Sequence, residues 1–242
     1  MSNPAGRLTV KSDGTVSGPA SISYNDPFPC VNGSWGSGAM QGVVMHTMVG
    51  NLPGTVTVFN DPSYQASSHF GIDQRGHIHQ FGPIGKSWIA WAQMAGNLAW
   101  YSIEHADNGN PENPLTDAQI TASAQLVEML SAFAGFPLQV TDSVSGRGYG
   151  THVMGGAAWG SHTCPGPGPR AGQRTAIVAR ARQIRTGPPP VTWQARALAD
   201  AEQIEAGATS LAALLTTGDT QIRAQAIETE AAALVTLLKA HQ

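Results

Sequence analysis

The segment "SSHFGIDQRGHIHQFG" at residues 67–82 decides the fold class, because it places two short apolar runs on either side of a tight turn. The turn, "QRG" at residues 74–76, has the length of a β-hairpin connection. Two further runs also suit strands. "QGVVMH" at residues 41–46 reads as a buried strand that ends at His46, and "AWYSIEHA" at residues 99–106 is rich in strand-forming residues. These segments predict a β-sheet in the domain.

Two helices are expected to accompany the strands. "TDAQITASAQLVEMLSAFAG" at residues 116–135 begins with Thr116 and Asp117, which favour a helix start, and ends at Gly135. Its apolar face is formed by Ile120, Leu126, Val127 and Leu130. A second helix is expected from about Arg170 to Arg185. Short strands mixed with helices predict an α/β domain.

The composition changes along the chain and predicts four segments. Residues 1–20 are polar and rich in Gly, Ser and Pro, residues 21–186 form the main domain, and residues 187–192 read as a proline-rich linker. In residues 193–242, apolar residues recur every three or four positions in two runs separated by Gly218 and Asp219. This pattern predicts an α-helical hairpin, which would serve either for self-association or docking or as a brace folded on the main domain.

The bulk numbers exclude several classes of protein. The chain has 242 residues, of which 41% are hydrophobic and 12% charged, and its formal net charge is −3. Because no cluster of Lys and Arg is present, we expect no nucleic-acid partner. No segment is long and apolar enough to predict membrane insertion, and residues 1–19 lack the pattern of a secretory signal.

Three residues are candidates for a metal site because of their positions. His46 ends a predicted buried strand, His152 follows the glycine-rich "GRGYG", and Cys164 lies in "SHTCPG". Two imidazoles and one thiolate suit a catalytic zinc, which needs three protein ligands and an open position. From the residues alone, other interpretations stay open. His69 and His79 also lie on strand-like runs, and Cys164 is equally suited to be a buried thiol or the disulfide partner of Cys30.

Five motifs together resemble the type 2 N-acetylmuramoyl-L-alanine amidases, a family that includes phage lysozyme-like amidases and animal peptidoglycan recognition proteins. They are "VVMHTMVG", "SSHFGIDQRGHIHQF", "YSIEHADNG", "GYGTHVMGG" and "SHTCPGPG". The resemblance covers roughly residues 41–169. It implies a central mixed β-sheet flanked by helices, a zinc ion held by two histidines and a cysteine or aspartate, and a muramoyl-peptide substrate. Carried over by position, the zinc ligands are His46, His152 and Cys164.

Glu104 is the candidate general base for cutting the lactyl–L-Ala amide bond of bacterial peptidoglycan. The period of two places Trp100, Ser102 and Glu104 on one face of their strand. A carboxylate in an apolar strand is costly unless it is paired or functional, although an edge-strand glutamate facing solvent is the alternative. The resemblance supports the functional interpretation, because some family members use a glutamate at the matching place.

The sequence departs from the family pattern at two places. Many relatives have tyrosine before the histidine that matches His69, where this chain has Ser68. Two residues before the cysteine, relatives often place lysine or threonine, where this chain has His162. An imidazole can donate the hydrogen bond that steadies an oxyanion, so His162 is a second catalytic candidate, with a plain loop residue as the alternative. His69 and Asn97 are expected to line the substrate groove.

The expected activity also suggests a biological setting. A wall-cutting enzyme made in the cytoplasm without a signal peptide is expected to be a phage or prophage endolysin. It would reach the cell wall after release through a holin, host lysis or an injection apparatus. Two alternatives stay open: a non-catalytic peptidoglycan-binding module of the same fold, and a zinc hydrolase of the same fold that acts on another amide.

Overall fold

The structure is a computed structural model that describes residues 7–24, 40–85 and 88–187, together with Thr229, Ala232 and Thr236. The chain divides into two compact units, residues 1–187 and residues 188–242. In the second unit the three described residues are helical. The predicted linker and helical hairpin otherwise lie outside the described residues, as does Cys30.

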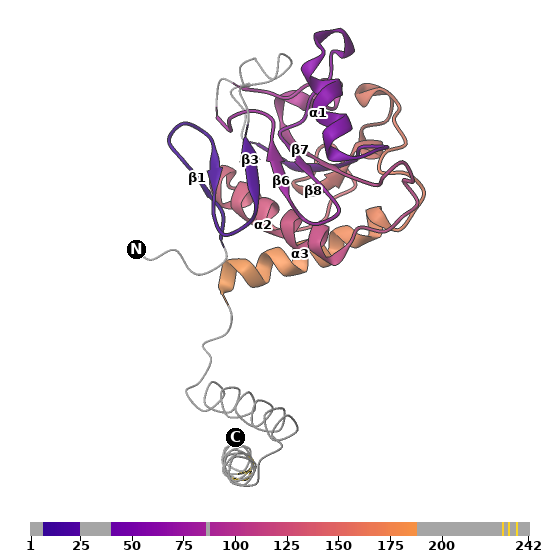
Figure 1. The fold of residues 1–242 in the computed structure, drawn as a ribbon. Coiled ribbons are helices and arrows are strands. Elements are labelled where there is room, and N and C mark those ends of the chain that lie inside the picture. Colours follow the sequence, from indigo (N-terminus) through magenta and orange to yellow (C-terminus); the bar gives the residue numbers. More distant parts are fainter. Residues whose placement is uncertain are drawn as a thin grey trace. The chain divides into compact units, whose positions relative to one another are not determined.

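A six-stranded mixed sheet forms the centre of the first unit (Figure 1). Its strands follow the order β3-β6-β5-β7-β4-β8, and each neighbouring pair is parallel except β5 and β6. Their bounds are β3 Ile22–Tyr24, β4 Gly42–Thr47, β5 Phe70–Ile72, β6 Ile78–Gln80, β7 Trp100–His105 and β8 Gly148–Thr151. This arrangement confirms the central mixed sheet, and the predicted hairpin at residues 74–76 is the antiparallel connection between β5 and β6.

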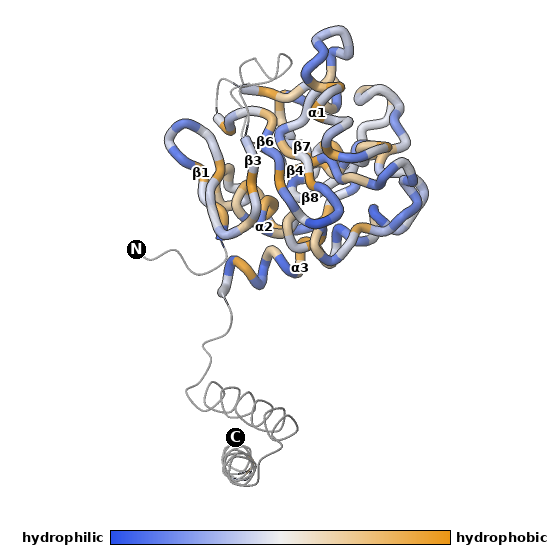
Figure 2. The backbone as a smooth tube through the Cα atoms, viewed as in Figure 1, coloured by the Kyte–Doolittle hydropathy of each residue, from blue (hydrophilic) through white to orange (hydrophobic). Residues whose placement is uncertain are grey.

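Two long helices, α2 (Asp117–Ala134) and α3 (Arg170–Thr186), pack against each other and cover one face of the sheet. The start of α2 is fixed by a capping box between Thr116 and Gln119, and its end by Gly135 in a left-handed conformation. Both helices lie close to their predicted bounds. The shared core contains apolar residues from the helices and from β4, β5 and β7, and Figure 2 shows hydrophilic loops around these hydrophobic central elements.

The shorter elements complete the unit. They are the helix α1 (Leu52–Asn60), the 3-10 helices η1 (Pro62–Tyr64), η2 (Met94–Leu98) and η3 (His152–Trp159), and a hairpin of β1 (Thr9–Val10) and β2 (Val16–Ser17). None of the described helices combines the length and the apolar character that crossing a bilayer requires.

The N-terminal boundary differs from the prediction that residues 1–20 stand apart. Leu8 and Val16 are buried in the same core as the sheet and α2. Arg7 also pairs with Glu128, a buried residue of α2. Residues 7–20 therefore belong to the main domain, because their few apolar side chains pack in the core that contains α2.

Candidate active site

Three adjacent parallel strands bring the predicted site residues side by side. In the register of β4 and β7, His46 lies opposite Glu104. In the register of β4 and β8, Met45 pairs with Thr151, so His46 and His152 each follow the last pair by one residue. Parallel strands end at the same edge of a sheet, where open α/β folds commonly bind ligands. The sheet therefore presents the two histidines and the carboxylate together.

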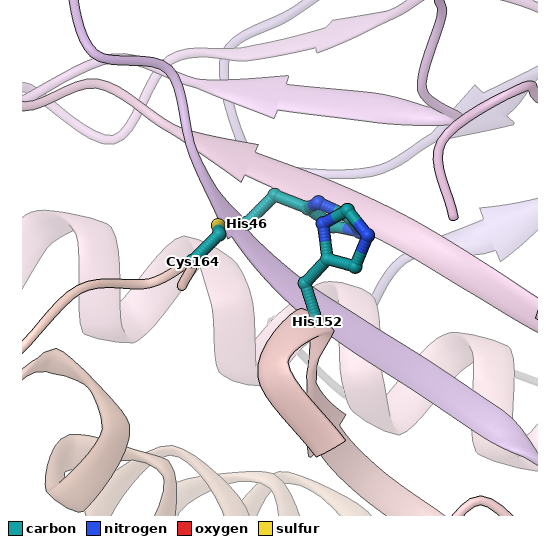
Figure 3. Close-up of side chains that lie close together, drawn as sticks. All are labelled: His46, His152 and Cys164. Carbon is teal, nitrogen blue, oxygen red and sulfur yellow. The ribbon is translucent and has the colours of Figure 1, made fainter. Parts of the chain in front are cut away.

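Cys164 joins this group from the loop after η3. The backbone N–H of Thr47 donates a hydrogen bond to Cys164 Sγ at 3.1 Å, and the N–H of Val153 donates to the Cys164 carbonyl at 2.9 Å. The candidate ligand atoms of His46, His152 and Cys164 all lie within 4.8 Å of one another (Figure 3). Within the described part of the chain, no other group of three or more His, Cys, Asp or Glu has the geometry of a metal site.

The chemistry of these three side chains fits a metal ion such as zinc. Burial lowers the pKa of His46 well below its usual value, with a further contribution from His152, and burial lowers the pKa of His152 to about 4. Both imidazoles are thus neutral at physiological pH, as metal ligation requires. Burial raises the pKa of the Cys164 thiol, so a thiolate at this place needs a cation beside it. A divalent metal ion supplies that cation.

Glu104 lies next to this group, with its Oε1 3.9 Å from His46 Nδ1. Burial, and then the charge of Asp107, raises the pKa of Glu104 to about 8. Its Oε2 is buried and has no hydrogen-bond partner among the described residues. A carboxyl group with a perturbed pKa and a free oxygen, placed in the lining of a cavity, is suited to proton transfer with a bound reactant.

A cavity of about 770 Å³ opens over these residues. Its lining includes the three candidate ligands and Glu104. The other lining residues are Thr47, Val49, Phe59, Tyr64, Gln65, Ala66, Ser67, Trp91, Ala92, Met94, Asn97, Pro111, His162, Thr163, Pro165, Gly166 and Pro167. Three apolar side chains on this lining are largely exposed: Val49 at 69%, Tyr64 at 60% and Met94 at 64%. The cavity thus combines a polar floor with apolar walls, as binding sites for organic molecules commonly do.

His162 lies at this cavity and stacks on His152, with ring centroids 4.4 Å apart and an interplanar angle of 21°. Its side chain is exposed, so it can meet a bound molecule. The position agrees with the predicted role beside a developing oxyanion, and that role stays a prediction.

The two predicted groove residues differ in position. Asn97 lines the cavity, but its Oδ1 accepts hydrogen bonds from the backbone N–H groups of Ala92 and Gln93. His69 is not among the lining residues. It is buried, and its Nδ1 accepts a hydrogen bond from the backbone N–H of Ser102 at 3.1 Å. His69 lies on the same side of the sheet as Glu104, because Ser102 and Glu104 share a face of β7, but it sits in the interior instead of the groove.

The structure also bears on His79, the other candidate ligand, and on the alternative interpretation of Cys164 as a disulfide partner. The Nδ1 of His79 is hydrogen-bonded with Ser23 Oγ at 2.8 Å, and His79 is not part of the metal-compatible group. Cys164 is a free cysteine.

Two buried residues that contact the site or its strands were not predicted from the sequence. Gln93 is hydrogen-bonded to His46, and the buried Arg170 donates to Thr47 Oγ1 and to the carbonyls of His105 and Ala106. Both are polar residues in segments that look like a loop and a helix surface. Their only sequence signal was a glutamine and an arginine with no assigned role.

The sequence matches the family model described as N-acetylmuramoyl-L-alanine amidase over residues 36–167. The chain belongs to this family. The match spans strands β4 to β8, the cavity and the whole candidate metal group, and it confirms the resemblance found in the sequence motifs. Membership makes the protein an enzyme, an N-acetylmuramoyl-L-alanine amidase acting on peptidoglycan.

Two individual proteins illustrate the relationship. N-acetylmuramoyl-L-alanine amidase A of Achromobacter lyticus is 30% identical over 127 residues, which cover 52% of this chain and 70% of the relative. The crystal structure of Staphylococcus aureus hydrolase AmiA in complex with its ligand aligns with a TM-score of 0.55 at 15% identity, covering 77% of this chain and 98% of that chain. The second likeness supports the fold, a mixed sheet with flanking helices.

Proposed function

We propose that this amidase depends on zinc, held by His46, His152 and Cys164, and cuts the amide bond between the lactyl group of the glycan and L-Ala of the stem peptide. The observation that carries the proposal is the convergence of three ligand atoms within 4.8 Å of one another, next to the Glu104 carboxylate. Two neutral imidazoles and one thiolate match the ligand set of catalytic zinc sites.

A bound zinc ion would activate water and polarise the scissile carbonyl. The protein supplies the other functions. Glu104 accepts the proton of the attacking water through its free Oε2, because this carboxylate lines the cavity beside His46 and the oxygen has no partner among the described residues. The same group then returns the proton to the leaving amine. His162, stacked on His152, donates a hydrogen bond to the oxygen that gains charge.

The apolar walls of the cavity exclude water from the reacting groups and contact the substrate. Val49, Tyr64 and Met94 expose most of their surface there. Burial of such surface on substrate binding contributes roughly 25 cal/mol per Å². The cavity therefore holds the amide close to Glu104 while leaving the rest of the muropeptide at the open side.

The test measures the release of soluble peptide and of new L-Ala amino ends from purified peptidoglycan. We expect release by the zinc-loaded protein, loss of release after chelation, and recovery when zinc is restored. Cys164→Ser and His152→Ala should lose both bound zinc and activity, while His77→Ala, a histidine outside the cavity, should keep both. Activity of the chelated, metal-free protein at the wild-type rate would refute the proposal.

We also propose that the enzyme acts as a phage or prophage endolysin, made in the cytoplasm and released to the wall. The support is the chemistry, since cutting stem peptides from the glycan removes the cross-links on which the wall depends. Expression in a bacterial host should leave cells intact until a holin is co-expressed, and should then lyse them. Cells that stay intact with the holin, while purified enzyme digests their isolated walls, would argue against this role.

A further inference from the structure

The side chain of Gln93 makes a set of contacts that fixes how it faces His46. Gln93 is 1% exposed, and its Oε1 lies 3.1 Å from His46 Nε2. Its amide nitrogen donates hydrogen bonds to the carbonyl oxygens of Trp100, at 3.0 Å, and Gly96, at 3.4 Å. Every polar atom of this buried amide therefore has a partner.

These contacts determine which nitrogen of His46 carries the proton. The carbonyls of Gly96 and Trp100 can only accept, so the amide nitrogen of Gln93 must face them and its oxygen must face His46. An oxygen at that place accepts a hydrogen bond from His46 Nε2–H. Neutral His46 then has its lone pair on Nδ1, the atom that lies on the side of Glu104.

The loop that carries Gln93 is itself held in place. Asn97 Oδ1 accepts from the backbone N–H of Gln93 at 2.7 Å and of Ala92 at 2.9 Å. A Cβ on Gly96 would lie 2.6 Å from the Trp159 ring and 2.7 Å from Gln93 Cγ, so only glycine leaves room for both. The Gln93 amide is thus set by packing and hydrogen bonding before any metal arrives.

We infer that Gln93 is a positioning residue that keeps His46 in the tautomer whose Nδ1 is free to bind a metal ion. The inference rests on the metal-binding part of the proposed function. The other two candidate ligands are oriented by backbone groups: the Trp159 carbonyl accepts from His152 Nε2 at 2.9 Å, and the Thr47 N–H donates to Cys164. Gln93 orients its ligand with a side chain, so a substitution can remove that support.

The test compares Gln93→Met with Gln80→Met in the full chain. Gln80 is a matched control, because it is also buried and its amide also bonds two carbonyls, those of Gly14 and Gly82, and accepts one N–H, that of Val16. Two-bond ¹H–¹⁵N spectra of the metal-free proteins report the His46 tautomer. Competition with a chromophoric chelator gives the Kd for zinc.

We expect Gln93→Met to raise the Kd for zinc by about 10–100-fold and to shift His46 towards a mixture of tautomers. Gln80→Met should lower the melting temperature yet keep the Kd and the tautomer of the wild type. Gln93→Glu keeps an acceptor opposite His46 Nε2 and, in its protonated form, can donate to the carbonyls of Gly96 and Trp100, so it should recover the Nε2–H tautomer.

Two results would overturn the inference: an unchanged tautomer and Kd in Gln93→Met, or an equal loss of zinc affinity in Gln80→Met. Failure of the proposed function looks different. If the wild type binds no zinc, the metal assignment fails, while the spectra of the metal-free proteins still decide whether Gln93 selects the tautomer of His46.

Discussion

The buried His69 should make the protein sensitive to mild acid, and substitution of this residue should remove part of that sensitivity. Burial lowers its pKa from 6.5 to about 3. Protons therefore bind the unfolded chain first as the pH falls, so the stability held by neutral His69 is complete above pH 6.5 and is lost progressively towards pH 3. At pH 5 the loss from this one residue is about 2 kcal/mol.

The assay is urea unfolding at pH 7.5 and pH 5, comparing the wild type with His69→Asn. Asparagine offers an acceptor near the position of Nδ1, which the Ser102 N–H uses, and it does not titrate in this range. The variant is less stable at pH 7.5, because a smaller side chain leaves a void. Between pH 7.5 and pH 5, the free energy of unfolding of the variant should fall by about 2 kcal/mol less than that of the wild type. An equal loss in both proteins, or a folded-state titration of His69 near pH 6.5, would refute the reasoning.

Three further substitutions test other parts of the structure. Arg170→Lys should lower the free energy of unfolding by about 2–4 kcal/mol, because an ammonium cannot replace the four hydrogen bonds of the buried guanidinium. An unchanged denaturation midpoint would contradict this prediction. Val49→Gly should stabilise the fold by about 0.5–1 kcal/mol, because Val49 has a φ of 49°, which glycine adopts more easily. It should also raise KM, because Val49 is one of the apolar residues that line the cavity. A lower melting temperature in calorimetry, or a lower KM, would contradict this prediction. His162→Ala should lower kcat by about 10²–10³-fold while zinc content stays constant, because a donor to the developing oxyanion is lost. An unchanged kcat would leave His162 as a loop residue.

Much of the fold could be predicted because its main elements carry strong local signals. The helix α2 has a capping residue, an apolar face and a terminal glycine, and the first four residues of β4, at 42–45, lack polar side chains. The helix α1 was missed because its sequence "LPGTVTVFN" contains proline, glycine and β-branched residues that do not favour a helix interior. The edge strand β8, "GYGT", was read only as a glycine-rich segment, since two of its four residues are glycine.

The candidate metal group could be proposed from sequence motifs, but its supporting residues could not. His46 and His152 stand at recognisable places, one after a buried strand and one after a glycine-rich run. Gln93 and Arg170 act through contacts between segments distant in sequence, such as the 47 positions between Gln93 and His46. A buried glutamine has the same local sequence signature as an exposed one, so only the folded chain identifies its partner.

The register of β8, β4 and β7 has a practical consequence for changing this enzyme. The separation between His152, His46 and Glu104 follows from the spacing of neighbouring strands, about 4.8 Å, and not from the loops that surround them. The exposed connection at residues 61–66 can therefore be exchanged to recognise different wall chemistries without changing the distances among the reactive groups. Deletion of one residue inside β4 would turn His46 to the opposite face of the sheet. The sheet is thus the rigid frame on which new substrate preferences can be built.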